Sequence, residues 1–180
     1  NIEMNRTGRK IQRLRVDNAS ILNDGVNKGW CREHSIAITP TIAGNHNQNG
    51  IAERAIQSIQ TVARTCLLSS KAPSNYWHHA LQYATWTLNR LPNARNKDNA
   101  PSVIAAGMQS QIDLTKFHPF YAPVSVRKIN NELARGNKLE ARGFAGNFLY
   151  NLQLGMMVVV DGKLKKRDQV IFLQPEQNNI

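Results

Sequence analysis

The stretch from Gln48 to Leu68 constrains the fold most, because it carries a long helical period. It opens with Asn49-Gly50, a turn signal, and apolar residues then recur at steps of three and four. These apolar residues are Ile51, Ala52, Ala55, Ile56, Ile59, Val62, Ala63, Cys66 and Leu67. The pattern predicts one helix that buries a broad face.

Two carboxylates mark the region around this helix. Glu53 lies in the predicted first turn, where the helix dipole favours a negative charge. Asp17 ends a short predicted strand, and 35 residues separate the two acids. Functional carboxylates are often displayed at strand ends in α/β sheets. Read alone, however, Asp17-Asn18 is equally typical of a turn, and Glu53 of an ordinary first-turn acid.

The motifs around both acids resemble those of integrases from copia-type LTR retrotransposons. The matching residues are Leu14 to Asn18, Gln48-Asn49-Gly50, Ile51-Ala52-Glu53-Arg54, Trp77, Leu88 to Pro92 and Gly143-Phe144. The resemblance extends from about Ile11 to Phe172. It implies an α/β fold: the C-terminal half of a ribonuclease H-like core of a DDE polynucleotidyl transferase, followed by a small Src-homology-3-like β-barrel. The expected boundaries are a partial core at 1–100, a linker at 101–115 and the β domain at 116–176.

The resemblance also implies a metal-dependent chemistry. Such enzymes hold divalent ions between three acids, and Mg²⁺ prefers oxygen ligands. Asp17 and Glu53 match the second and third acids, so both are candidate catalytic residues and ligands of Mg²⁺ or Mn²⁺. The first acid is expected on an upstream strand, but the only acid before Asp17 is Glu3, in a polar stretch. We therefore expect the first ligand to be missing, the core to be truncated at its N-terminus, and activity of the chain alone to be doubtful.

Charge and local motifs predict a nucleic-acid partner. The formal net charge is +11, which favours a polyanion. Candidate contacts to nucleic acid are Asn18, Gln48, Asn49, Arg54, Lys163, Lys165, Lys166 and Arg167. Each has a simpler alternative: Gln48 and Asn49 can cap the helix, Arg54 can pair with a neighbour, and the basic run can be a solvated hairpin.

The remaining elements follow from local patterns. A weak helical stripe spans 22–34, and Ser35 to Thr39 reads as a strand. Ser74 is predicted to cap a second helix that ends near Leu91. Its buried face is expected to comprise Tyr76, Trp77, Ala80, Leu81, Ala84, Thr85 and Leu88. His78 and His79 are expected at the surface or at an interface. Strands are expected at 144–150, 156–160 and 169–173, with a hairpin turn at Asp161-Gly162.

Three functions compete at this point. The first is a segment of an integrase that joins element DNA to target DNA, working in the nucleus after a cytoplasmic particle stage, as the resemblance implies. The second is an inactive remnant that binds DNA or RNA. The third is a helical module for self-association, since integrases form oligomers. No stretch is apolar for long enough to predict a membrane span, and Cys31 and Cys66 form no disulfide framework.

Overall fold

A computed structural model describes residues 10–16, 25–40, 50–96, 99–106, 112–129, 132, 141–152 and 154–173. By their internal contacts the residues divide into two compact units. The first comprises 1–58 and 102–109, and the second comprises 59–101 and 110–180. The division falls inside the long helix and depends on contacts alone. The domain boundaries expected from the sequence therefore stay a prediction.

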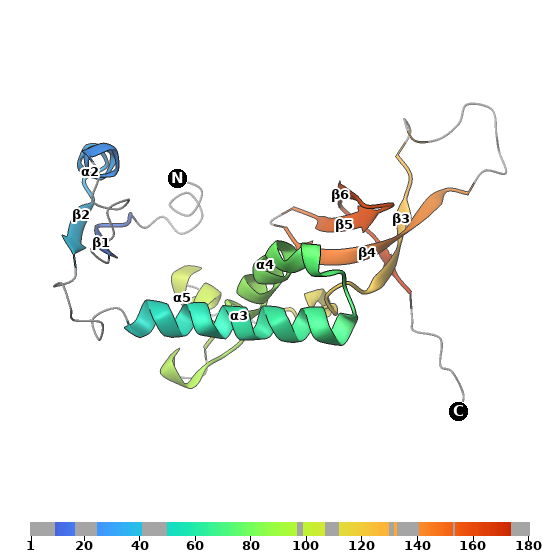
Figure 1. Cartoon of the computed structure of the whole chain (residues 1–180), viewed down its shortest axis with the longest axis horizontal. Helices are drawn as coiled ribbons and strands as arrows, with labels where there is room; N and C mark the ends of the chain where they lie inside the picture. The colour runs from blue at the N-terminus through green and yellow to red at the C-terminus, as the bar shows by residue number, and fades with distance from the viewer. Residues whose placement is uncertain are drawn as a thin grey trace. The chain divides into compact units, whose positions relative to one another are not determined.

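The first unit contains a strand–helix–strand motif (Figure 1). Strand β1, Arg13–Val16, is followed by helix α2, Gly25–Glu33, and strand β2, Ala37–Pro40. The two strands pair in parallel, with Arg13 opposite Ala37 and Val16 opposite Pro40. Parallel strands need a crossover, and α2 supplies it. The α/β prediction and the predicted strand before Asp17 are both confirmed.

The long helix α3, Gly50–Ser70, confirms the predicted central helix, but its predicted face is not buried throughout. Ala63 is its buried residue, and Ile59, Val62, Cys66 and Leu67 pack around it. Ile51 and Ile56 are exposed, at 61% and 54%. The helical period was therefore correct, while burial follows only the half of α3 that belongs to the second unit. A short helix, α5, spans Pro101–Ala106.

The helix that follows α3 begins later than predicted. Ser74 opens a 3-10 turn, Ser74–Tyr76, and α4 spans Trp77–Leu88 without a side-chain cap. The predicted Ser74 cap is therefore wrong. Ala80 and Ala84 are fully buried, as expected, whereas Trp77 is 58% exposed. The buried face of α4 therefore begins at His79 and not at Trp77.

A five-stranded antiparallel sheet forms the other part of the second unit (Figure 1). Its strands are β3, Pro123–Arg127; β4, Gly143–Asn151; β5, Met156–Val160; β6, Lys163–Arg167; and β7, Ile171–Phe172. The order is β6-β5-β4-β3-β7. This confirms the predicted β-rich region. The strand β6 itself was not predicted, because its basic residues hide the alternation that marks a strand.

Both faces of this sheet contribute to the core. Leu149 and Val159 pack with Ala80 and Ala84 of α4. The neighbouring Phe148, Val158 and Val160 point to the other face and pack with Val124 and Val126 of β3. Strand side chains form the buried part of that second cluster, and Tyr83 of α4 packs against it. Gly146 permits the close approach of β4 to β5, because a Cβ there would lie 2.5 Å from the Val159 carbonyl oxygen.

The hairpin between β5 and β6 is confirmed. Asp161 and Gly162 form a two-residue loop, and their φ values are 48° and 72°. Two positive φ angles are those of a type I′ turn, whose twist matches that of the paired strands. The turn fixes the register that places Val160 opposite Lys163 and Met156 opposite Arg167.

Candidate functional site

Of the two predicted acids, Glu53 is among the described residues and Asp17 is not. Glu53 lies in the first turn of α3, as expected, and is exposed. Asp17 follows directly after β1 and lies outside the described residues. The predicted convergence of Asp17 and Glu53 on a metal therefore stays a prediction. Within the described ranges, no group of three or more His, Cys, Asp or Glu side chains is placed to hold a metal.

The predicted contacts beside Glu53 are also only partly described. Asn18, Gln48 and Asn49 lie outside the described residues. Arg54 is exposed, and its Nε donates a hydrogen bond to the Gly50 carbonyl oxygen at 3.2 Å. That bond uses one of the five guanidinium donors, so the rest of the group can still contact a phosphate.

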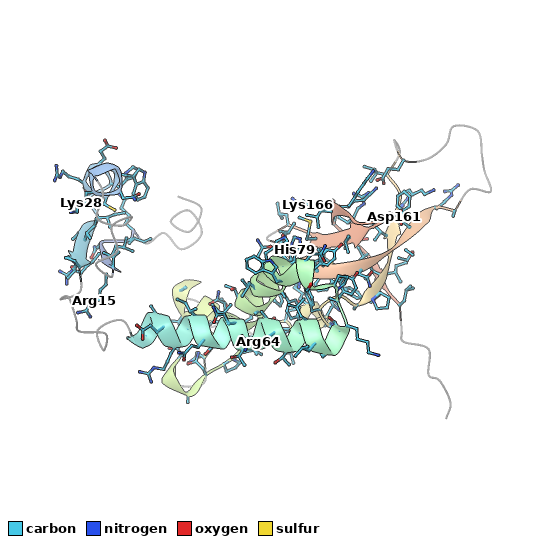
Figure 2. All side chains as sticks on the ribbon, viewed as in Figure 1. Arg15, Lys28, Arg64, His79, Asp161 and Lys166 are labelled. Carbon is cyan, nitrogen blue, oxygen red and sulfur yellow. The ribbon has the colours of Figure 1, made fainter. Side chains whose placement is uncertain are left out.

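The predicted basic run forms one strand, β6, whose residues alternate in exposure. Lys163 and Lys166 are exposed, whereas the side chains of Lys165 and Arg167 are only 22% and 12% exposed. Figure 2 shows Lys166 and Asp161 on the β5–β6 hairpin. In a strand, Lys163, Lys165 and Arg167 share one face and Lys166 lies on the other. The four cations are therefore not equivalent.

Glu132 pairs with the two less exposed cations, and the sequence analysis did not single it out. Its Oε1 and Oε2 both accept from Nη2 of Arg167 at 2.7 Å, and Lys165 Nζ also donates to Oε1. The backbone N–H of Ile129 donates to Oε2 at 3.0 Å. Lys165, Ile129 and Arg167 together hold the pKa of the Glu132 carboxyl well below its usual range, at about 2. Glu132 is therefore ionised throughout the neutral range.

An aromatic ring completes this cluster. The ring centroid of Phe144 lies 4.5 Å from Lys165 Nζ and 4.8 Å from Lys128 Nζ. A cation near an aromatic ring gains about 0.5–1 kcal/mol at exposed sites. No sequence signal could have found the cluster, because its members come from segments that meet only through the pairing of β3, β4, β5 and β6.

His79 is buried and not at the surface, which was one of the two places expected for it. It lies on α4 with 5% exposure (labelled in Figure 2), and its ring stacks on that of Tyr150 of β4 with centroids 5.7 Å apart. Burial lowers the pKa of His79, and the neighbouring imidazole of His78 adds to this effect. The α4 face is wider than the sequence pattern indicated, because the sheet covers position 79 as well as Ala80.

A basic hollow lies between α2 and β2 of the first unit. Its volume is about 330 Å³, and its lining comprises Lys28, Cys31, Arg32, Ile36, Ile38 and Pro40. Cys31 is buried there, and both cysteines are free thiols. No helix in the described part of the chain is long and apolar enough to span a membrane.

The chain is similar in sequence to two transposon polyproteins. No family model matches it. It is 36% identical over 87 residues to the "Retrovirus-related Pol polyprotein from transposon TNT 1-94" of Nicotiana tabacum, a match that covers 48% of this chain and 7% of the polyprotein. It is 30% identical over 115 residues to the "Transposon Ty1-LR3 Gag-Pol polyprotein" of Saccharomyces cerevisiae, covering 63% of this chain and 6% of that one.

A solved structure, the "CryoEM structure of simian T-cell lymphotropic virus intasome in complex with PP2A regulatory subunit B56 gamma", aligns with 94% of this chain and 58% of its own. The TM-score is 0.49 at 18% identity. The two transposon matches span less than a tenth of each polyprotein. They confirm the relationship indicated by the sequence motifs: the chain is homologous to a segment of retrotransposon Pol polyproteins.

Proposed function

We propose that the chain is a nucleic-acid-binding segment of a retrotransposon integrase. The observation that carries this proposal is the homology to transposon Pol polyproteins. The net charge of +11 supports it, because Lys and Arg that neutralise phosphates supply most of the nonspecific affinity for DNA. The proposed partners are element and target DNA, bound by an oligomer of the chain in the nucleus.

The exposed cations of β6 are the proposed DNA contacts in the second unit. Lys163 and Lys166 are exposed, and no ion pair with them is found among the described residues. Arg54 is the proposed contact beside Glu53, together with Asn18, Gln48 and Asn49. Phosphate contacts of this kind position a nucleic acid without reading its sequence.

Asp17 and Glu53 are the residues that would hold Mg²⁺ or Mn²⁺. Their chemistry fits, since both are carboxylates and Glu53 is solvent-exposed, but the described residues alone do not supply a complete ligand set. The bound ion would activate the attacking oxygen and stabilise the leaving one in phosphoryl transfer. Glu53 lies in the first turn of α3, near the positive end of the helix dipole.

Binding is tested first, by fluorescence anisotropy of a labelled duplex DNA with the full chain over a range of salt concentrations. We expect affinity to fall as salt rises, with a slope of about −0.9 for each phosphate contact in the plot of log K against log salt. Lys163→Gln and Lys166→Gln should each weaken binding and flatten the slope. Affinity that does not depend on salt would overturn the proposal.

Chemistry is tested with Mg²⁺ or Mn²⁺ and an oligonucleotide that carries element ends. Nicking or strand transfer that Asp17→Asn and Glu53→Gln both abolish, and that the control Glu33→Gln leaves unchanged, would assign the two acids to a metal site. DNA binding without any metal-dependent product would favour the inactive remnant.

The N-terminal half of α3 favours self-association as a second candidate. Two large apolar side chains in this half of α3 are uncovered: Ile51 is 61% exposed and Ile56 is 54% exposed. Sedimentation of the full chain, compared with the Ile51→Ser/Ile56→Ser variant, tests this alternative. An oligomer that the variant dissociates would support it, whereas a monomer in both cases would exclude it.

A further inference from the structure

Glu132 competes for the same cations that a nucleic acid would need. Each oxygen of its carboxylate accepts from Arg167, and Lys165 contacts one of them. The side chain of Glu132 is itself only 18% exposed. Because the side chains of Lys165 and Arg167 are only 22% and 12% exposed, a phosphate reaches the donors that Glu132 occupies only when the carboxylate moves aside.

The position of Glu132 is fixed locally as well as by the two cations. Its backbone N–H donates to the Ile129 carbonyl oxygen at 2.8 Å, while the Ile129 N–H donates to its carboxylate at 3.0 Å. These reciprocal bonds tie Glu132 to Ile129, two residues beyond the end of β3, while its carboxylate contacts β6, which β4 and β5 separate from β3 in the sheet. The ladder between β5 and β6 does not include Glu132, so moving its carboxylate leaves those strand pairs intact.

We propose that Glu132 is a built-in competitor of phosphate that masks Lys165 and Arg167, so that β6 first offers only Lys163 and Lys166 to a nucleic acid. This inference rests on the proposed function. A phosphate that displaces the carboxylate would gain two cations at once. The strand therefore has a weak state with two available cations and a strong state with four.

The test uses the full chain and the anisotropy assay at about 0.1 M salt. Glu132→Gln keeps the shape of the side chain but removes its charge. We expect it to bind DNA roughly tenfold more tightly and to steepen the salt slope by up to about 1.8, the value for two added phosphate contacts. Asp168→Asn is the matched control: it removes one exposed negative charge beside Arg167, and no ion pair of Asp168 is found among the described residues. Its affinity should rise about twofold or less, in line with screening of an exposed charge.

A second comparison stands independently of the Glu132 variant, should that variant fail to fold. Lys163 and Lys165 share one face of β6, but only Lys165 is masked. Lys163→Gln should weaken binding several-fold, whereas Lys165→Gln should change it less than about twofold in the native background. In the Glu132→Gln background, both lysine substitutions should weaken binding equally.

The outcomes distinguish two claims: that Glu132 masks Lys165 and Arg167 (called the mask here), and that the chain binds nucleic acid. If the native chain binds DNA and Glu132→Gln binds no more tightly than Asp168→Asn, the mask is wrong and DNA binding stands. Equal losses for Lys163→Gln and Lys165→Gln in the native chain would also overturn it. If the native chain does not bind but Glu132→Gln does, the mask is supported in its strongest form. If neither binds, both the mask and the proposed function fall.

Discussion

The two sheets of the molecule differ in how much they bury. In the parallel pair β1–β2, the described residues are exposed or half-exposed except for Val16. In the antiparallel sheet, Val124, Val126, Phe148, Leu149 and Val158 are fully buried. The second unit therefore has a core of its own among the described residues, while the first unit, which carries the candidate acids, shows little. Stability and candidate chemistry reside in different parts of the chain.

The largest expected effect on stability comes from truncating a side chain in the core of the antiparallel sheet. Phe148→Ala should lower the free energy of unfolding by about 3–5 kcal/mol, because it empties a fully buried site between β3 and β5. Val16→Ala, in the weaker sheet, should cost less than about 1.5 kcal/mol, since a Val removes fewer atoms and Val16 has few buried neighbours. Urea unfolding followed by circular dichroism measures both. Similar losses of unfolding free energy in the two variants would contradict the difference in burial between the two sheets.

Glycine substitutions should have opposite signs in the two units. Gly146→Ala places a Cβ 2.5 Å from the Val159 carbonyl oxygen, so we expect a loss of about 1–3 kcal/mol. Gly29→Ala lies inside α2 with no atom within 4 Å of the new Cβ, and should stabilise by up to about 1 kcal/mol. Thermal unfolding of the two variants decides. A stabilising Gly146→Ala would contradict the close approach of β4 and β5.

The loss of folding stability at acid pH should depend on protonation of His79 in the second unit. Its folded pKa is lowered, so the unfolded chain binds the proton more readily. Stability is then fully present above the unfolded pKa of about 6.5 and is lost as the pH falls below it. His118, whose pKa burial also lowers, contributes in the same direction. The slope from one such group is at most about 1.4 kcal/mol per pH unit.

Replacing the buried imidazole sharpens this test. His79→Phe keeps a ring against Tyr150 and should reduce the loss of stability between pH 7 and pH 5, whereas the exposed His78→Gln should leave most of it. Denaturant midpoints at several pH values provide the measurement. An unchanged slope in His79→Phe would show that His79 is not the titrating group.

The smallest expected effect belongs to Glu132. Its folded pKa of about 2 lies below the ordinary value of 4.5, so its contribution to stability is present above pH 4.5 and fades as the pH falls toward 2. Glu132→Gln should remove that part of the acid dependence and change little between pH 6 and pH 8 beyond a constant offset. Unfolding curves between pH 2 and pH 5 test this. A steeper acid loss in the variant would contradict the pairing.

Local patterns predicted the elements better than their burial. Periodicity found α3, and Asp161-Gly162 located a hairpin, because both signals lie within a few consecutive residues. Burial of His79 and exposure of Trp77 depend on which face of α4 the sheet covers, and no local pattern encodes that. The cluster of Glu132, Lys165 and Arg167 depends on strand order. The sequence therefore indicated the two cations as a basic run, but it did not indicate that Glu132 pairs with them.

The most direct test of the account is a ¹⁵N NMR titration of the full chain with a short duplex DNA at low salt. We predict that the amide shifts of Lys163 to Arg167 move on addition of DNA, that the movement shrinks as salt is added, and that Lys163→Gln/Lys166→Gln reduces it. Shifts that leave β6 unchanged while DNA binds elsewhere would contradict the assignment of this strand as the nucleic-acid contact.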